Sequence, residues 1–407
     1  FLVIRLDMKY GKFKMRIFET MQYYKRSTAK YFLVTIFLCS SGWIYAQSVL
    51  TGADQMDSYL HRLHNKKVGL FVNHTSIVGQ THLSDSLLTL GINITTVFSP
   101  EHGIKGNKPD GEKIINEESE AYELISLYGQ SKRPDTSRLS QLDILVVDIQ
   151  DVGVRCYTYV STLTYLMEGC ALVGTPVLLL DRPNPNAYVD GPILEERFES
   201  FIGLHPVPLV HGLTLGEYAS MINGEGWLDG GLHCKLDIIP VKNWDHSLPY
   251  SVPVPPSPNL PNDLSIALYP SLVLFEGTIA SIGRGTSYPF QVIGHPDFTG
   301  GTFSFTPQPN EGSKYPPLEN TQCFGIGLLN QEPKYQLNIS FLIDFYNNLK
   351  LTSEPFFDSD RFILRAGTDQ LQMQIESGLS EAEIRASWQQ DLNEFLKLRQ
   401  KYVLYEN

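Results

Sequence analysis

The sequence is poor in cysteine, in positive charge and in the motifs of nucleotide-binding proteins, and each shortage excludes a class of protein. Five cysteines in 407 residues are too few for a disulfide scaffold, and no C-x-x-C spacing indicates a zinc or redox site. The 32 basic side chains against 44 acidic ones give a formal charge of -12, which argues against a nucleic-acid-binding protein. No G-x-G-x-x-G follows the first predicted strand and no G-x-x-x-x-G-K-[ST] occurs, so we expect no nucleotide cofactor.

Two common catalytic patterns are also missing. The sequence contains neither the G-x-S-x-G of serine hydrolases nor the H-E-x-x-H of zinc peptidases, and its ten histidines are scattered along the chain. We therefore expect no catalytic metal. The composition does provide 42% hydrophobic residues, over a length that allows two domains with sizeable cores.

Residues 21–46 have the layout of a secretory signal peptide. A basic stretch at 25–30 precedes an apolar run at 31–39, and the small residue Ala46 marks the expected cleavage site. The apolar run is much shorter than the roughly 20 residues that a membrane-spanning helix needs. We therefore expect residues 1–46 to be upstream sequence and a cleaved leader, and the protein to be periplasmic or secreted, with no stable membrane span.

Removal of this leader would change the charge and the cysteine count. Because residues 1–46 hold eight basic and two acidic side chains, the remaining chain would have 24 basic and 42 acidic ones, a formal charge of -18. Sequence alone does not choose among the possible disulfide pairings of the other cysteines, and we expect most to be buried free thiols. These cysteines are Cys156, Cys170, Cys234 and Cys323.

Short apolar runs alternate with helical patterns in the first half of the remaining chain. Strands are predicted at 67–73, 92–98, 142–149, 176–181 and 235–241, and helices at 81–90, at 161–173 and from Thr214, whose spacing to Glu217 fits a capping box. Continuous apolar runs separated by helices are typical of βαβ units, in which helices cover both faces of a parallel sheet. We therefore predict a Rossmann-like α/β domain over 47–262.

The pattern changes at the proline-dense stretch 251–261, which cannot be a helix or a central strand. This stretch is interpreted either as a domain junction or as a rigid active-site loop. After it, a segment at 277–302 is rich in glycine, threonine and serine, and amphipathic segments follow at 338–349 and 380–401. We predict a smaller α+β domain over 263–407.

Polar residues follow the first four predicted strands at the positions where these strands end. In open parallel sheets ligands bind outside the carboxyl ends of the strands, so these residues are candidates for a polar cleft that suits a hydroxyl-rich ligand. The candidates are Asn73, His74, Glu101, His102, Asp148, Gln150, Asp151, Arg155, Tyr157, Tyr159, Arg182 and, before the capped helix, His211.

Glu101 is the foremost candidate for acid–base chemistry. Pro100 restricts Ser99 to an extended conformation and Gly103 lets the chain turn, so the carboxyl group would be held at the edge of the sheet. A cleft can raise the pKa of such a carboxyl group until it works as a general acid. The alternative for Glu101 is a surface turn.

Ordinary structural roles compete with other assignments as well. An aspartate at the end of a strand, such as Asp148 or Asp151, often caps the next helix. Tyr157 and Tyr159 are core aromatics in the alternative interpretation.

The C-terminal half offers a second carboxylate and a cation. Glu276 precedes Gly277, and two glycines flank Arg284, which permits a tight loop. A guanidinium group there suits a substrate carboxylate, and glycosidases usually need two carboxyl groups. A structural ion pair and a turn-rich surface loop are the alternatives.

Eight motifs, taken together and in this order, resemble the exo-β-N-acetylmuramidases of bacteria, the NamZ type. The motifs are NHTS at 73–76, FSPEHGIKG at 98–106, SLYG at 126–129, DIQDVGVRCYTYVST at 148–162, LDRPNPN at 180–186, HGLTLGE at 211–217, PPSPNLP at 255–261 and FEGTIASIGRGT at 275–286. The similarity runs from about residue 66 to the end. One departure is Cys156, where members of the family more often carry a bulky apolar residue.

The resemblance implies a glycosidase that releases N-acetylmuramic acid from the non-reducing end of peptidoglycan fragments during cell-wall turnover and recycling. It also implies an active site in a cleft between the Rossmann-like domain and the C-terminal domain. The family's proposed catalytic glutamate falls on Glu101. Its polar surroundings fall on His102, Arg155, Tyr157 and Glu276.

The second catalytic group stays open between Tyr157, Glu276 and the acetamido group of the substrate itself. Arg155 and Arg284 are the predicted partners of the muramic acid carboxylate. Two other classes of protein are the alternatives. A non-catalytic peptidoglycan- or glycan-binding protein would bind without turnover, and a metal-dependent cell-wall amidase or esterase would lose activity in a chelator.

Overall fold

The computed structural model describes residues 48–101, 103–105, 117–118, 121–129, 132–332 and 334–405. Ser48–Asn407 form one compact unit. The predicted leader at 21–46 and the candidate His102 lie outside the described residues. Within the described ranges, no helix has both the length and the apolar character that crossing a membrane requires.

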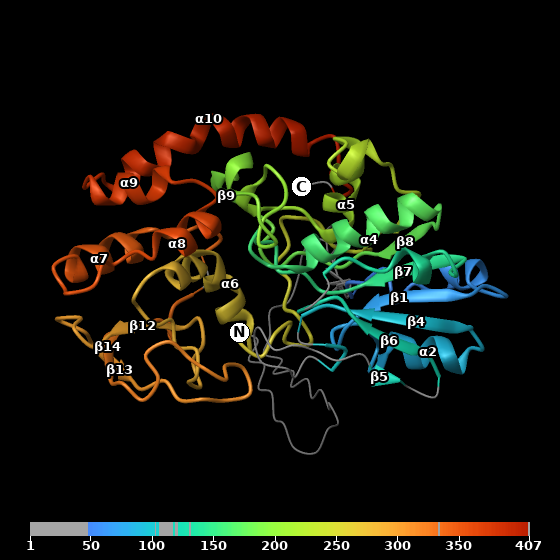
Figure 1. The fold of residues 1–407 in the computed structure, drawn as a ribbon, viewed down its shortest axis with the longest axis horizontal. Helices are drawn as coiled ribbons and strands as arrows, with labels where there is room; N and C mark the ends of the chain where they lie inside the picture. The colour runs from blue at the N-terminus through green and yellow to red at the C-terminus, as the bar shows by residue number, and fades with distance from the viewer. Residues whose placement is uncertain are drawn as a thin grey trace, which may run out of the picture. The chain divides into compact units, whose positions relative to one another are not determined.

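A seven-stranded sheet forms the centre of the first part of the chain (Figure 1). Its strands are β1 (Val68–Val72), β4 (Ile94–Ser99), β5 (Glu117–Glu118), β6 (Glu123–Ser126), β7 (Ile144–Asp148), β8 (Val177–Leu180) and β11 (Leu236–Ile239). They lie in the order β11-β8-β7-β1-β4-β6-β5, and every neighbouring pair is parallel except β5 with β6. The parallel strands confirm the predicted Rossmann-like α/β class, and the winding direction of the sheet reverses between β1 and β7.

Both faces of the sheet are buried because its strands send alternate side chains into two hydrophobic cores. In β1, Phe71 belongs to one core and its neighbour Leu70 to the other. The first core includes side chains of α4 (Tyr159–Val173) and α5 (Leu215–Gly224), and the second includes those of α2 (Leu83–Thr89). Burial on two faces explains why the strands are continuous apolar runs in the sequence.

Five of these strands lie at the predicted apolar runs. The apolar pattern does not predict β6, because its four residues ELIS include a glutamate and a serine and give no continuous apolar run. The predicted capping box is present: the Thr214 hydroxyl accepts a hydrogen bond from the Glu217 N–H, and the Glu217 carboxylate accepts one from the Thr214 N–H. The shorter elements are α1 (Met56–Tyr59), η1 (Leu60–Arg62), β2 (Ile77–Val78), β3 (Thr81–His82), α3 (Thr136–Leu139), β9 (Val189–Ile193), η2 (Glu196–Phe198), β10 (Pro208–His211) and η3 (Asp229–Gly231).

The chain after the proline-rich stretch forms a smaller α+β part, as predicted. Its three-stranded antiparallel sheet has the order β12-β14-β13. The elements are α6 (Asp263–Leu272), η4 (Val273–Gly277), β12 (Val292–His295), β13 (Phe303–Phe305), β14 (Cys323–Gly327), α7 (Ser340–Leu349), α8 (Ser359–Ala366), α9 (Gln370–Glu376) and α10 (Glu381–Arg399). The last helix, α10, is red in Figure 1 and contacts β9 of the first part.

All four cysteines in the described part of the chain are buried and free, as expected from the sequence. Burial raises the pKa of the Cys234 thiol to about 12 and that of the Cys323 thiol to about 11. These two thiols therefore stay protonated and unreactive at neutral pH.

Candidate active site

A cavity of about 450 Å³ lies where the loops after β4 and β7 meet η4 and α8. The predicted catalytic residues Glu101, Tyr157 and Glu276 line it together with the predicted binding residues Tyr159 and Arg284. Two strand ends and the C-terminal part therefore contribute to one site. The other lining residues are Tyr128, Lys132, Cys156, Thr158, Ser200, Phe201, Ile202, Ser257, Asn259, Leu260, Tyr269, Phe290, Leu364 and Arg365.

Glu101 is held in a tight turn at the end of β4. The Gly103 N–H donates a hydrogen bond to the Pro100 carbonyl at 3.1 Å, and Gly103 has a φ of 70°, a value that favours glycine. The Thr158 hydroxyl, at the start of α4, donates to Glu101 Oε2 at 3.2 Å. The turn predicted from the sequence is present, and it places a half-buried carboxyl group in the cavity wall.

Tyr157 and Tyr159 form the cavity wall beside the proline-rich stretch. Their hydroxyls donate to the Pro256 carbonyl at 2.9 and 3.2 Å, and their rings pack edge to face with centroids 4.6 Å apart. Asn73 Nδ2 donates to the Tyr159 hydroxyl at 2.9 Å, so Asn73 supports this wall and does not itself line the cavity. Burial raises the pKa of Tyr157 well above its usual value, so this phenol stays neutral.

The proline-rich stretch 251–261 is a loop at the cavity. Asn259 lines the cavity, and its Nδ2 donates to the Gly312 carbonyl at 2.7 Å. His74 Nε2 lies 2.7 Å from the Pro255 carbonyl, so this predicted binding residue contacts the loop and not the cavity. Of the two interpretations offered by the sequence, these contacts favour the rigid active-site loop.

Glu276 is held between two arginines. Arg284 donates to Glu276 Oε1 from Nε, at 2.9 Å, and from Nη2, while Arg365 Nε donates to Oε2 at 3.1 Å. Burial alone would raise the pKa of Glu276, but the charges and hydrogen bonds of the two guanidinium groups outweigh burial and lower that pKa. Glu276 is therefore an ionised carboxylate with both oxygens engaged.

The cavity lining is more positive than the chain as a whole. Among the described lining residues, Lys132, Arg284 and Arg365 lie beside the carboxyl groups of Glu101 and Glu276, three cations against two acids, whereas the whole chain carries -12. A local excess of positive charge favours an anionic ligand. In the described residues, no three His, Cys, Asp or Glu side chains are grouped so that they could hold a metal ion.

Arg155, a predicted substrate-binding residue, lies outside the cavity lining. Its Nη1 donates to the carbonyls of Pro192 and Val207 at 3.0 and 2.8 Å. Its Nη2 donates to the carbonyls of Arg365 and Ala366 at 3.0 and 2.7 Å. The side chain is only 4% exposed. Arg155 therefore joins the first part of the chain to the end of α8, and this role replaces the expected contact with a ligand carboxylate.

Four further predicted binding residues are buried away from the cavity. Arg182 pairs with Asp148 through two hydrogen bonds, Nε to Oδ1 at 2.5 Å and Nη2 to Oδ2 at 2.9 Å. Gln150 donates to two backbone carbonyls, each at 2.8 Å. His211 accepts a backbone N–H, and burial lowers its pKa to about 3. These side chains form hydrogen bonds with a buried charged group or with backbone groups. Buried polar groups generally need such partners.

Asp151 also lies outside the cavity lining, and its carboxyl group is buried. Oδ1 accepts the Gly153 N–H at 2.7 Å, but Oδ2 has no hydrogen-bond partner in the described part of the chain. Burial raises the pKa of Asp151 to about 7. The folded protein therefore keeps a proton on Asp151 at pH values where an unfolded aspartate has released it.

We expect the variant Asp151→Asn to gain stability relative to the wild type as the pH rises. Because the pKa of Asp151 is higher in the folded state than in the unfolded state, its proton contributes to the stability of the wild type. This contribution is fully present below about pH 4 and is lost as the pH rises through about 7. Asparagine does not titrate, so the difference in the free energy of unfolding should shift toward the variant by roughly 2–4 kcal/mol between pH 4 and 8. Urea unfolding at several pH values measures this shift, and a constant difference would contradict a protonated Asp151.

Several polar cavity residues are absent from the sequence prediction, among them Lys132, Thr158 and Arg365. Thr158 precedes a helix, and threonine at that position has an ordinary explanation as a cap. Arg365 lies in the last turn of α8, where basic side chains are common because they interact favourably with the free carbonyls. Lys132 follows β6, the strand that the apolar pattern does not predict. The local sequence therefore accounts for these residues by ordinary structural roles, or by a strand that it does not predict, and does not indicate that they line the cavity.

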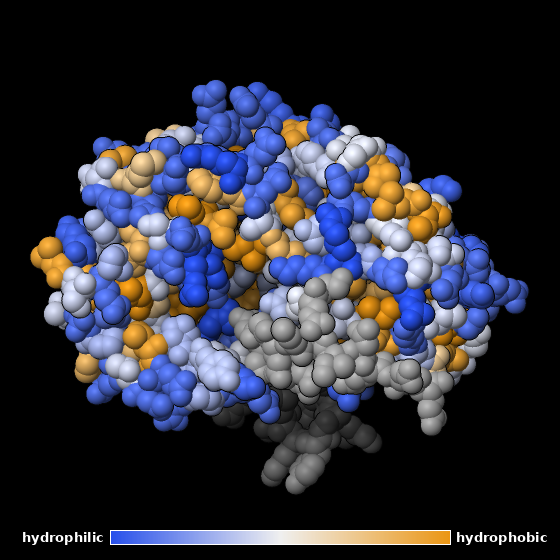
Figure 2. Space-filling model, viewed as in Figure 1, coloured by the Kyte–Doolittle hydropathy of each residue, from blue (hydrophilic) through white to orange (hydrophobic). Residues whose placement is uncertain are grey.

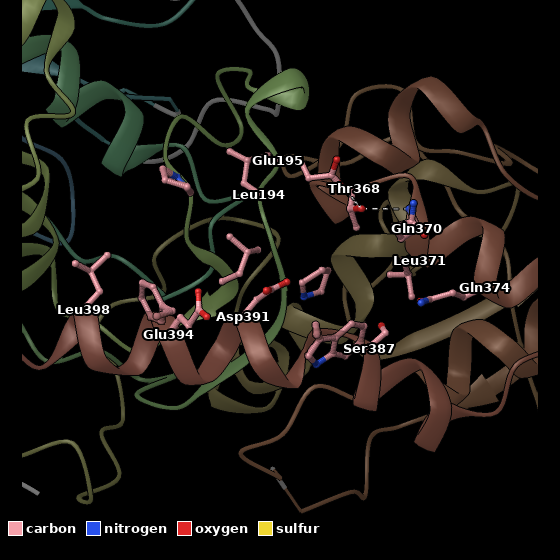
Figure 3. A pocket seen from close by; sticks show the side chains of 15 residues that line it. Leu194, Glu195, Thr368, Gln370, Leu371, Gln374, Ser387, Asp391, Glu394 and Leu398 are labelled. Atoms are coloured by element: carbon pink, nitrogen blue, oxygen red, sulfur yellow. Dashed lines mark hydrogen bonds between the residues drawn. The ribbon is translucent and has the colours of Figure 1, made fainter.

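A second, larger cavity of about 540 Å³ lies between β9, α9 and α10 (Figure 3). Figure 2 shows hydrophobic residues at the surface between α8 and α10. No described residue from the loops after β4 or β7 lines this cavity, and its Glu195 is paired with Arg197 at 2.7 Å. The smaller cavity is therefore the better candidate for catalysis. The residues of the larger one are Pro192, Ile193, Leu194, Glu195, Pro206, Thr368, Gln370, Leu371, Gln374, Ser387, Trp388, Asp391, Glu394, Phe395 and Leu398.

Known proteins and family models resemble this chain over most of its length. The N-terminal model of exo-β-N-acetylmuramidase NamZ matches residues 68–264, and the C-terminal model matches residues 267–405. The peptidoglycan β-N-acetylmuramidase NamZ of Bacillus subtilis (strain 168) is 36% identical over 393 residues, which cover 88% of this chain and 91% of that protein. Two crystal structures of DUF1343 family proteins from Bacteroides fragilis match with TM-scores of 0.81 and 0.74, at 45% and 26% identity, and each match covers 88% of this chain and 99% of the other.

Proposed function

The chain belongs to the exo-β-N-acetylmuramidase NamZ family and is a glycosidase, and we propose that it releases N-acetylmuramic acid from the non-reducing end of peptidoglycan fragments. One observation carries the proposal for this site. The cavity holds Glu101 on a fixed turn, its walls come from segments between residues 101 and 365 that are far apart in the sequence, and three cations are among its described lining residues. A carboxyl group for proton transfer and a positive lining together suit an anionic sugar.

Glu101 is the proposed general acid. In glycoside hydrolysis the bond between the anomeric carbon and the glycosidic oxygen breaks, its electron pair stays on the oxygen, and that oxygen must receive a proton. The Thr158 hydroxyl fixes the orientation of the Glu101 carboxyl group in the cavity wall. After the leaving sugar departs, the Glu101 carboxylate takes a proton from water and returns to its starting state.

The acetamido group of the substrate is the proposed nucleophile. Both Glu276 oxygens already accept hydrogen bonds from guanidinium groups, which makes this carboxylate a weaker nucleophile toward the anomeric carbon. The raised pKa of Tyr157 disfavours a phenolate. The acetamido oxygen would instead bond to the anomeric carbon and form a cyclic oxazolinium ion, which water opens. This route predicts retention of the anomeric configuration.

We place this activity outside the cytoplasm, in the turnover and recycling of the cell wall. The signal-peptide layout of residues 21–46 supports a periplasmic or secreted enzyme. Peptidoglycan fragments occur in the same compartment, so enzyme and substrate would meet there.

Product analysis tests the proposed function. The purified protein is incubated with a disaccharide that carries N-acetylmuramic acid at its non-reducing end, and mass spectrometry should detect two monosaccharides. The matched control is the disaccharide with the two sugars in reverse order, which should stay intact. Binding of the first disaccharide without cleavage would instead support a glycan-binding protein. Chelator-sensitive release of peptide or acyl groups would support a metal-dependent amidase or esterase.

A further inference from the structure

We infer that Arg284 and Arg365, organised by Glu276, form the receptor for the lactyl carboxylate of muramic acid and thereby select this sugar over N-acetylglucosamine. The inference rests on the proposed function and adds a specificity-determining residue, Arg365, to it. The two sugars differ only in the lactyl ether, which carries one negative charge. A site that discriminates between them therefore needs a cation at a defined place.

The fold brings the two arginines to the same carboxylate from separate elements. Gly277 ends η4, and a Cβ atom there would lie 2.4 Å from the Phe362 Cα, so glycine permits the close packing of η4 on α8. Arg365 follows Phe362 by one helical turn and therefore reaches Glu276. Arg284 arrives from the loop in which Gly283 and Gly285 both have a φ of 78°.

The charge of this cluster suits a carboxylate. The two guanidinium groups of Arg284 and Arg365 face the one carboxylate of Glu276, so positive groups outnumber negative ones among these three side chains. The side chains of Arg284 and Arg365 are 14% and 20% exposed, and both residues line the cavity. Partial burial strengthens a charge pair relative to one in bulk water. Planar guanidinium groups also bind carboxylates with two parallel hydrogen bonds.

Other cations fit this task less well. The Arg155 guanidinium is bonded to four backbone carbonyls and lies outside the cavity lining. Lys132 lines the cavity, but its ammonium group lies 3.9 Å from the centre of the Phe201 ring, in a cation–π contact. The arginine cluster therefore remains the best candidate.

The test compares two chromogenic substrates, the β-glycoside of N-acetylmuramic acid and the same glycoside with its lactyl carboxylate converted to an amide. The wild type should prefer the carboxylate by about 10- to 100-fold in kcat/KM, the range expected for hydrogen bonds to a charged group. Arg365→Met should lose most of that preference, mainly through a higher KM for the carboxylate substrate. Arg361→Met is the matched control on the same helix, and its exposed side chain predicts unchanged kinetics.

Two results would overturn the inference. An equal loss of activity on both substrates in Arg365→Met would mean that Arg365 only positions other groups. Loss of the preference in Lys132→Met, with the preference intact in Arg365→Met, would assign the carboxylate to Lys132.

A binding measurement separates this inference from the proposed function. Calorimetry with free N-acetylmuramic acid and free N-acetylglucosamine should show a preference for the former that Arg365→Met reduces. If the wild type cleaves neither glycoside, the proposed function fails, and the calorimetric preference still decides the role of Arg365.

Discussion

Replacement of Glu101 by glutamine should lower kcat for the natural disaccharide by about 10²–10⁴-fold, the range attributed to general acid–base catalysis. Glutamine has nearly the same shape and can still contact the Thr158 hydroxyl, but it has no proton to give to the glycosidic oxygen. The half-buried carboxyl group stands on a turn fixed by Pro100 and Gly103, so the substitution should leave the fold intact. Release of the two monosaccharides by the purified variant measures the effect.

The leaving group offers a sharper version of this experiment. A nitrophenol leaves readily without a proton, whereas a sugar hydroxyl does not, so Glu101→Gln should lose much less activity on a nitrophenyl glycoside than on the disaccharide. Glu311→Gln, an exposed glutamate outside the cavity lining, is the control and should match the wild type. Equal losses on the two substrates would argue that Glu101 binds the sugar and does not protonate the leaving oxygen.

Replacement of Asp148 by asparagine should lower the free energy of unfolding by about 3–5 kcal/mol, because it leaves the buried Arg182 charge without its counter-ion. The side chains of Arg182 and Asp148 are 2% and 0% exposed and share two hydrogen bonds. Burial alone would lower the pKa of Arg182, but the Asp148 carboxylate outweighs burial and raises that pKa. Asp148→Asn removes this support, but a guanidinium group keeps its charge even when buried, because its intrinsic pKa lies far above neutral pH. Arg182 therefore stays charged after the substitution, and chemical denaturation should register the loss.

The pair of Arg62 with Asp237 provides the control for this stability effect. Its two atoms are 2.5 Å apart, but the side chains are 32% and 62% exposed. Exposed ion pairs contribute about 0–1 kcal/mol, so Asp237→Asn should cost far less than Asp148→Asn. Similar losses of the free energy of unfolding in the two variants would mean that burial does not explain the contribution of the Asp148–Arg182 pair to stability.

The parts of the site that sequence reasoning predicted correctly depend on neighbours along the chain. The turn at Glu101 follows from Pro100 before it and Gly103 after it, and the tight loop around Arg284 follows from its flanking glycines. Such conformations need only local backbone preferences, which can be recognised in a single sequence. These local conformations identify side chains that can line a cavity, such as Glu101 and Arg284, but they do not predict which residues those side chains contact.

Arginines show where this reasoning stops. Arg155, Arg182 and Arg365 all follow or end regular elements, and sequence reasoning selected the first two as ligands. In the structure, Arg155 is occupied by carbonyls up to 211 residues away and Arg182 by a buried aspartate, while Arg365 lines the cavity. Burial and long-range hydrogen bonds determine which of these arginines can contact a ligand. Neither can be predicted from the neighbouring residues in the sequence.

By itself, the sequence determined the parallel α/β sheet, the smaller C-terminal α+β part, the capped helix at Thr214 and the turn that presents Glu101. These features depend on hydrophobic periodicity and on turn and cap residues within a few positions of one another. Only the tertiary structure decided that Glu276 is clamped by Arg284 and Arg365 and that Asp148, Arg155 and Arg182 serve the fold. These roles arise where segments that are distant in the sequence bury charged groups next to each other. An unpaired buried charge is costly, so its partner is set by the tertiary structure and not by the neighbouring sequence.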